Sequence, residues 1–282
     1  MVNLNGKLHE NADCKLSFEN RGYKFGDALF ETLKVVNSRI LFWEDHYFRL
    51  MASMRILRME IPMSFTMEFL EQEILKTIEA NGWSDCVTRV RFNIDRGEGG
   101  KYLPFNQNIN YSIVTEKIEG ELYCISEGST YTIDIFKDYF VAPSLLSTLK
   151  TNNKIINVLG SIYAKENDLD NCILLNTNKN VVEALNGNLF IVNGNTLKTP
   201  PLEDGCLKGI MRKQLIDVIK KDNSYEISET SISPFELQKA DELFITNVIV
   251  GIQSITNYRK KAYSNEVTKE LLGQLNRKIA QI

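Results

Sequence analysis

Short β-type runs alternate with amphipathic helical segments along nearly the whole chain, and this alternation is the strongest constraint on the fold. In the first half, runs at 28–36 and 39–42 are joined at Asn37-Ser38 and lead into a helical pattern from Tyr47 to Leu57. In the second half, Asn193-Gly194 joins two further β-type runs, which is a strong hairpin signal. This mixture of hairpins and helices predicts an α/β or α+β protein with two domains.

Helix ends can be placed from capping residues. Ser64 is expected to cap a second helix, and Asn81-Gly82 to end it. A third helix is expected to begin near Thr151, and Ser233-Pro234-Phe235-Glu236 forms a capping box with proline at the first helical position. Further strands are expected at 86–95, 109–115, 130–136, 173–175, 181–183, 189–192 and 196–199, and a last helix at 267–279.

One polar segment interrupted by glycines divides the sequence. It reads EKIEGELYCISEG at 116–128, a composition typical of an interdomain connection. We therefore expect a smaller N-terminal α/β domain at 1–117, a connection at 118–128 and a larger C-terminal domain at 129–282.

Composition narrows the function classes. The 282 residues, 43% of them hydrophobic, suffice for two domains with buried cores. The chain has 33 Lys and Arg against 36 Asp and Glu, so its net charge of -3 gives no basic footprint for nucleic acid. Its start resembles no targeting peptide, and no run approaches the 18 apolar residues of a membrane span. We expect a cytoplasmic protein without nucleic-acid or membrane partners.

Cysteine and histidine usage excludes several kinds of site. The five cysteines form no CxxC pair, which argues against a disulfide framework or a zinc site. There are two histidines and no GxSxG turn, so a His-rich metal centre and a serine hydrolase are both disfavoured. Proton transfer is therefore expected to belong to lysine, tyrosine, a carboxylate or a cofactor.

Three segments together carry a recognisable chemistry. Lys150 lies where a partly apolar β-type stretch gives way to a helix, and Glu183 lies between a buried strand and a turn rich in Gly and Asn. Residues 205–212, GCLKGIMR, form a loop that enters a helix, whose first backbone N–H groups can bind a phosphate. Pyridoxal phosphate needs an amine, an anion opposite its ring nitrogen and a phosphate site. Taken alone, Lys150 would be read as a solvated lysine at a helix start.

The sequence resembles the class IV aminotransferases, the fold type IV pyridoxal-phosphate family that includes branched-chain aminotransferases, D-amino-acid aminotransferases and aminodeoxychorismate lyases. The matching segments are RGYKFGDALFET at 21–32, EDHYFRL at 44–50, LKTNN at 149–153, VVEALNGNLF at 181–190, LKGIMR at 207–212 and ADELFITN at 240–247. They follow one another in the family's order and span most of the chain.

The resemblance implies a two-domain α/β (α+β) fold like that of D-amino-acid aminotransferase, with pyridoxal 5'-phosphate in the interdomain cleft. Lys150 is then the Schiff-base lysine and the catalytic base, and Glu183 faces the pyridine nitrogen. Arg49 binds the phosphate with the backbone amides of Ile210 and Met211. The last matching pattern adds Asn247 and Val248 to the cofactor site, although Val248 stands where branched-chain aminotransferases have a phosphate-binding threonine.

A substrate carboxylate calls for a guanidinium or an ammonium group. Arg91, which alternates with Arg89 along one strand face, would suit this role, as would Arg96 and Lys101 in the loop beyond. The other reading is that these are exposed charges at a strand end. Phe25 and Phe30 are expected to line the pocket, although aromatic residues in such a strand are more often core.

Two reactions compete on this scaffold. The family pattern favours an aminotransferase that moves the amino group of a branched-chain-like amino acid to a 2-oxo acid. Lys154, where branched-chain aminotransferases have a tyrosine, and DRGEGGKY at 95–102 instead favour an aminodeoxychorismate lyase that makes 4-aminobenzoate and pyruvate. A third reading is a binding protein that keeps the fold without catalysis.

The resemblance also implies a homodimer whose active sites borrow a loop from the partner. Phe42, Trp43, Met51 and Met54 surround EDHYFRL, and enrichment of aromatic residues and methionine is a mark of interface cores. The same residues would also suit a core within one domain.

Overall fold

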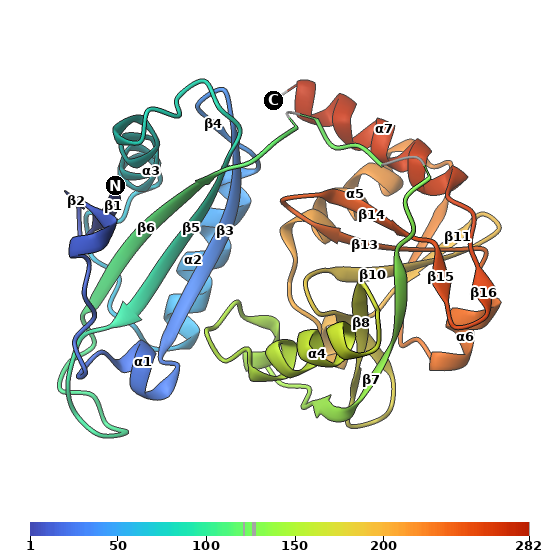
Figure 1. The fold of residues 1–282 in the computed structure, drawn as a ribbon, viewed down its shortest axis with the longest axis horizontal. Helices are drawn as coiled ribbons and strands as arrows, with labels where there is room; N and C mark the ends of the chain where they lie inside the picture. Colours follow the sequence, from blue (N-terminus) through green and yellow to red (C-terminus); the bar gives the residue numbers. More distant parts are fainter. Residues whose placement is uncertain (121, 126–127, 282) are drawn as a thin grey trace. The chain divides into compact units, whose positions relative to one another are not determined.

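The protein is described by a computed structural model that covers residues 1–120, 122–125 and 128–281 (Figure 1). The chain forms two compact units, Met1–Glu121 with Lys150–Asn153, and Leu122–Leu149 with Lys154–Ile282. The expected connection at 118–128 includes residues 121, 126 and 127, which lie outside the described residues. The expected domain limits stay a prediction.

The first unit is built on one antiparallel sheet with the strand order β2-β1-β6-β5-β3-β4. Its strands are β1 (Val2–Leu4), β2 (Lys7–His9), β3 (Ala28–Val36), β4 (Arg39–Ile40), β5 (Thr88–Arg96) and β6 (Ile109–Lys117). Residues of β5 alternate between buried and half-buried along the strand, as expected for a sheet with one covered face. The covered face of β5 carries Val90, Phe92 and Ile94.

Three helices complete the first unit: α1 (Arg21–Phe25), α2 (Trp43–Ile56) and α3 (Met67–Ala80). Helix α2 packs against β3 and helix α3 against β6 (Figure 1). The prediction that Ser64 caps α3 is wrong, because the N-cap is Thr66, whose hydroxyl accepts a hydrogen bond from Phe69 N at 3.2 Å. Asn81 ends the helix and Gly82 follows with φ of +70°, as predicted.

The aromatic and methionine residues around EDHYFRL belong to the core of the first unit. Phe42, Met51 and Met54 are buried within the single chain, and the Trp43 indole donates a hydrogen bond to Met67 O at 3.2 Å. Of the two readings of these residues, the structure therefore favours the core within one domain, and they give no separate support for a dimer.

A short segment of the chain, residues 150–152, pairs with the edge of β3. Phe30 N donates to Lys150 O at 2.9 Å and Asn152 N donates to Ala28 O at 3.0 Å, with Thr151 opposite Leu29. Residues 150–152 thus pair with β3 in an antiparallel manner, on the edge opposite β5. The helix expected near Thr151 begins later, because these backbone groups are used by β3.

The second unit contains two five-stranded sheets, ordered β12-β11-β10-β13-β14 and β16-β15-β7-β8-β9. Their strands are β7 (Thr132–Val141), β8 (Asn171–Asn176), β9 (Val181–Ala184), β10 (Asn188–Asn193), β11 (Thr196–Thr199), β12 (Glu226–Glu229), β13 (Glu242–Asn247), β14 (Gly251–Ile255), β15 (Asn257–Tyr258) and β16 (Lys261–Ala262). Apolar residues from both sheets form one core, which includes Ile133, Ile173, Ile191 and Leu243.

Four helices surround these sheets: α4 (Ile155–Glu166), α5 (Ile210–Asp222), α6 (Pro234–Lys239) and α7 (Glu266–Ala280). Helix α4 packs on β7 and β8, which are parallel, so β7, α4 and β8 form a crossover unit (Figure 1). Helix α5 packs against α7 and β13. No helix in the described part of the chain is both long and apolar enough to cross a membrane.

Candidate functional site

Lys150 is held by its backbone on the edge of β3, and its side chain lies against an aromatic ring. Its Nζ is 4.3 Å from the centroid of the Phe30 ring, and Phe30 is buried. An ammonium group at this distance from a ring face is stabilised by the ring quadrupole. The pairing with β3 and the contact with Phe30 together fix the position of this lysine.

Arg91 lies against the same ring. Its Cζ is 3.8 Å from the Phe30 centroid, its Nε donates to Asn93 Oδ1 at 2.8 Å, and its Nη2 donates to Asn152 Oδ1 at 3.4 Å. Burial and the charge of Arg89 lower the pKa of Arg91. The structure thus brings together Lys150, Phe30 and Arg91, three residues singled out from the sequence.

Arg49 belongs to a second cluster, with two residues that the sequence reasoning did not single out. Its Nε donates to Glu31 Oε1 at 2.8 Å and its Nη2 to Glu31 Oε2 at 2.5 Å. His46 Nδ1 lies 2.8 Å from Glu31 Oε2. Glu31 is paired across the strands with Phe92, so it points to the helix-covered face of the sheet, whereas Phe30 points to the other face.

Burial and the neighbouring side chains together determine the protonation states of Glu31 and His46. Burial alone would raise the pKa of Glu31, but the charge of Arg49 and the hydrogen bond with His46 lower that pKa to about 2. Burial lowers the pKa of His46, although Glu31 opposes the shift. His46 is therefore neutral at pH 7 and donates its Nδ1–H to the carboxylate. Within the described residues, His46 Nε2 has no hydrogen-bond partner.

In the second unit, Glu183 lies on β9 and faces the loop that leads into α5. Its Oε2 accepts a hydrogen bond from Leu207 N at 2.9 Å. A backbone donor favours the ionised carboxylate and fixes its direction. The nearby thiol of Cys206 is buried and close to this charge, and burial together with Glu183 raises its pKa to about 12.

The N-terminus of α5 carries the amides expected to bind a phosphate. The first hydrogen bond of the helix runs from Lys213 N to Gly209 O, so the N–H groups of Ile210 and Met211 precede it. A side chain at Gly209 would place Cβ 1.9 Å from Asn188 Oδ1. The side chain of Asn188 in turn donates a hydrogen bond to Leu207 O at 2.9 Å, so the residues that lead into α5 are closely packed.

Asn247 and Val248 lie at the turn between β13 and β14. Asn247 Oδ1 accepts hydrogen bonds from Ile249 N at 3.0 Å and Val250 N at 3.1 Å, which closes the turn. The hydroxyl of Tyr123 donates to Val248 O at 2.5 Å. These contacts give both residues a clear part in shaping the turn.

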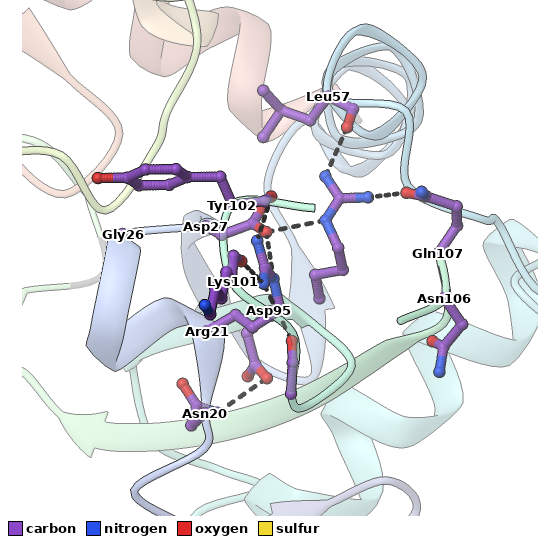
Figure 2. A network of polar contacts seen from close by, with 12 residues as sticks. Asn20, Arg21, Gly26, Asp27, Leu57, Asp95, Lys101, Tyr102, Asn106 and Gln107 are labelled. Carbon is purple, nitrogen blue, oxygen red and sulfur yellow. Dashed lines mark hydrogen bonds and ion pairs between the residues drawn. The ribbon is translucent and has the colours of Figure 1, made fainter. Parts of the chain in front are cut away.

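Arg96 is placed differently from the other substrate candidates. It lies on the helix-covered face of β5, opposite to Arg91, and is 6% exposed. Its Nε donates to Asp27 Oδ2 at 2.8 Å, its Nη2 donates to Leu57 O at 2.6 Å, and its Nη1 donates to Gln107 (Figure 2). The same Nη1 also donates to Arg58 O at 3.0 Å. With its donors bound to the protein, Arg96 is a poor candidate for a substrate carboxylate.

Phe25 and Lys101 lie near each other at the end of the first unit's sheet. The Phe25 ring is 5.7 Å from that of Tyr102 and 36% exposed, and Lys101 is exposed. Arg21, which the sequence reasoning left without a role, donates to Lys101 O at 2.6 Å (Figure 2).

The model of the family described as amino-transferase class IV matches residues 28–258. The chain belongs to the class IV aminotransferase family. The expected α/β fold of this family is confirmed by a solved class IV aminotransferase, the branched-chain aminotransferase of Thermoproteus uzoniensis with norvaline. Its TM-score is 0.88 at 23% identity, over 99% of this chain and 94% of that one.

Two other class IV relatives bear on the reaction. A Methanocaldococcus jannaschii protein with a provisional branched-chain-amino-acid aminotransferase name is 28% identical, over 100% of this chain and 96% of its own length. The 4-amino-4-deoxychorismate lyase of Pseudomonas aeruginosa is 25% identical with a TM-score of 0.83, over 98% of each chain.

Family membership implies pyridoxal phosphate, and the residues present fit this cofactor. Lys150 supplies a restrained amine, Glu183 a carboxylate with a fixed direction, and α5 a helix N-terminus whose approach has no room for a Cβ at Gly209. Sequence reasoning missed Glu31, His46 and Arg21. For Glu31 a signal was available in ALFETL at 28–33, where a charged residue stands in an otherwise largely apolar strand.

Proposed function

We propose that this class IV aminotransferase moves the amino group of a branched-chain-like amino acid to a 2-oxo acid, with pyridoxal phosphate held by Lys150. The observation that carries the proposal is the position of Lys150, whose backbone is paired with β3 and whose amine lies on the Phe30 ring. The family match over residues 28–258 supports the aminotransferase reading.

The cofactor, when bound, supplies an aldehyde that condenses with amines and a ring that accepts the electron pair left by Cα–H cleavage. Glu183 would keep the ring nitrogen protonated, and its bond from Leu207 N holds the carboxylate ready for this role. The amides of Ile210 and Met211 would bind the phosphate at the positive end of the α5 dipole. The family resemblance implies that Arg49 is a further ligand of the cofactor phosphate.

Lys150 would tether the cofactor and then act as the base that removes the α-proton of the substrate. A base must return repeatedly to one position, and the bonds of residues 150–152 to β3 restrict the backbone of this lysine. Phe30 stabilises the ammonium form that results once the proton has been taken up.

Arg91 is the substrate-carboxylate residue that the contacts support best. Its guanidinium lies on the same ring as Lys150 Nζ, so a carboxylate bound by Arg91 would belong to a molecule within reach of the lysine. Phe30 would then serve both cations. Lys101 would contribute from the loop that follows β5, and Phe25 from the end of α1.

A second candidate function is aminodeoxychorismate lyase. DRGEGGKY at 95–102 favours it, as do Lys154 after Asn153 and the likeness to the Pseudomonas aeruginosa lyase. The lyase would use the same Lys150 as its base, but would release pyruvate and 4-aminobenzoate.

We also propose a homodimer in which the partner contributes a loop to each site, on the ground of the family resemblance. A monomer mass in light scattering of the fully active holoenzyme would contradict the shared site. The cytoplasmic location stays a prediction.

The reaction is tested by half-reactions of the holoenzyme with leucine, valine, glutamate, D-alanine and aminodeoxychorismate. Conversion of the lysine-bound cofactor to pyridoxamine phosphate, followed by absorbance, is expected with the branched-chain L-amino acids and glutamate. Formation of 4-aminobenzoate without conversion by any amino acid would replace the aminotransferase by the lyase.

A further inference from the structure

The loop that follows β5, residues 97–105, has a well-defined backbone conformation, and the apolar side chains at its tip are exposed. Gly99 and Gly100 have φ of +87° and +78°, and a Cβ at Gly100 would lie 2.4 Å from Leu103 O. Tyr102 is 90% exposed and Phe105 81%. Because its apolar side chains are exposed, the loop is stabilised little by hydrophobic burial, and polar contacts must hold its conformation.

Arg21 supplies those contacts. Its Nη1 donates to Gly99 O at 3.0 Å and to Lys101 O at 2.6 Å, and its Nη2 donates to Tyr102 O at 3.2 Å (Figure 2). The residue is 3% exposed, so these are charge-assisted hydrogen bonds shielded from water. One guanidinium therefore binds three carbonyls in the turn of the loop.

The guanidinium is itself anchored from the other side. Its Nε donates to Asp27 Oδ2 at 2.9 Å, and the same oxygen accepts from Arg96 Nε at 2.8 Å. Asn20, which precedes α1, caps this helix by accepting from Tyr23 N at 2.9 Å and donates to Asp95 at the end of β5 (Figure 2). Contacts with residues next to α1 and on β5 thus hold Arg21 on the side away from the loop.

The anchored arginine also brings a helix residue to the loop. The Arg21 guanidinium lies 4.9 Å from the Phe25 ring centroid, and the Phe25 ring contacts Tyr102. Lys101, Tyr102 and Phe25 are therefore positioned together by one side chain that is almost completely buried.

We propose that Arg21 is a positioning residue, which holds the loop 97–105 in the conformation that presents Lys101 and Tyr102 beside Phe25 for substrate binding. This inference rests on the proposed function, because the substrate in question is the amino acid named there. Arg21 does not touch the substrate itself; it acts through the loop carbonyls. Its loss therefore weakens substrate binding and leaves the chemistry at Lys150 unchanged.

Trypsin tests the hold of Arg21 on the loop without any reference to catalysis. Lys101 is exposed, but the carbonyl of the bond that trypsin would cleave accepts a hydrogen bond from Arg21. Cleavage requires this carbonyl to enter the protease's oxyanion hole, so Arg21 protects the bond. Native holoenzyme is incubated with trypsin, and the fragment 1–101 is followed by mass spectrometry.

The first variant is Arg21→Lys, because a lysine keeps the charge and cannot span three carbonyls and Asp27. Cleavage after Lys101 is expected to become about tenfold faster or more, which is the scale of one lost charge-assisted hydrogen bond. The KM for the amino acid is expected to rise about tenfold with kcat within about twofold. Gly100→Ala disturbs the same loop without touching Arg21, and the same two changes are expected; it keeps the proposal testable if Arg21→Lys does not fold.

The matched control is Arg259→Lys, since Arg259 forms an exposed pair with Asp134. Cleavage after Lys101 and KM should both equal those of the wild type. Wild-type cleavage in Arg21→Lys, fast cleavage with unchanged KM, or a loss of kcat at constant KM would each overturn the proposal. If the wild type converts no amino acid, the proposed function fails, and cleavage alone decides whether Arg21 holds the loop.

Discussion

Arg49 and Glu31 form a bidentate ion pair in which Nε and Nη2 of the arginine bind the two carboxylate oxygens at 2.8 and 2.5 Å. Both side chains are buried, at 9% and 3% exposure. Because the guanidinium is planar, engagement of one edge fixes the direction of the whole group. Arg49 is the residue proposed to bind the cofactor phosphate, so Glu31 determines how that arginine is presented.

Glu31→Gln should destabilise the protein, since it leaves the Arg49 guanidinium buried without its carboxylate. The free energy of unfolding, measured with urea, should fall by about 3 to 5 kcal/mol. Glu116→Gln is the control, because it breaks the exposed pair with Arg89 and should cost less than about 1 kcal/mol. Equal effects of the two substitutions would contradict the importance of the buried pair.

Acid should weaken the fold through the same cluster. The pKa of Glu31 is about 2 in the folded protein against 4.5 as the ordinary value, so the unfolded chain binds more protons between these values. Stability therefore falls as the pH falls through this window, by about 3 kcal/mol in total. His46, with its lowered pKa, adds a loss of the same sign below pH 6.5. Urea unfolding between pH 7 and pH 3 should show a shallower pH dependence for Glu31→Gln than for the wild type.

Lys150→Ala should abolish the visible band of the lysine-bound cofactor and turnover with every amino acid. Borohydride reduction of the wild type followed by peptide mapping should label Lys150. Lys165→Ala, at an exposed position of α4, should keep both the band and the activity. A label on another lysine would show that the site has been assigned to the wrong residue.

Arg91→Gln should raise the KM for the amino acid by about ten- to a hundredfold, because a carboxylate loses its bidentate partner. Arg96→Gln should instead lower the unfolding free energy, since Arg96 binds Asp27 and two backbone carbonyls on the other face of β5. Steady-state kinetics and urea unfolding of both variants separate these effects. An unchanged KM in a folded Arg91→Gln enzyme would remove Arg91 from the substrate site.

Gly209→Ala should weaken cofactor binding by about three- to tenfold, because its Cβ would collide with Asn188 Oδ1 and shift the first amides of α5. Titration of the apoenzyme with pyridoxal phosphate measures this. Gly273→Ala is the matched control: its Cβ would come no nearer than 3.9 Å to Arg277 Nη1, and alanine in α7 should add up to about 1 kcal/mol of stability. Cofactor affinity should be the same in this control as in the wild type.

Features encoded locally could be predicted from the sequence. The hairpin at Asn193-Gly194 is confirmed, with Asn193 opposite Thr196, and so is the capping box at Ser233 with Glu236. Each depends on residues a few positions apart, whose turn or cap geometry is set by their own side chains. The fold could be expected from the family resemblance for a similar reason. The matching motifs are short contiguous segments that can be read directly from the sequence.

Features that depend on distant pairing could not be predicted. Ser64 and Thr66 both offer a capping hydroxyl, and the structure shows that α3 begins after Thr66. Arg91 and Arg96 both looked suitable for a carboxylate, but they point to opposite faces of β5, and only the positions of Asp27 and Gln107 show that Arg96 is occupied. The delayed start of α4 follows from the bonds between residues 150–152 and β3.

The pairing of Lys150 with the edge of β3 has a consequence for any exchange of parts between this enzyme and a relative. The lysine is encoded within the stretch of sequence that builds the second unit, but it is folded into the sheet of the first. Exchange of either unit as a gene fragment would separate the lysine from the strand that orients it. An exchange that is meant to keep this pairing would have to carry residues 150–153 together with the first unit.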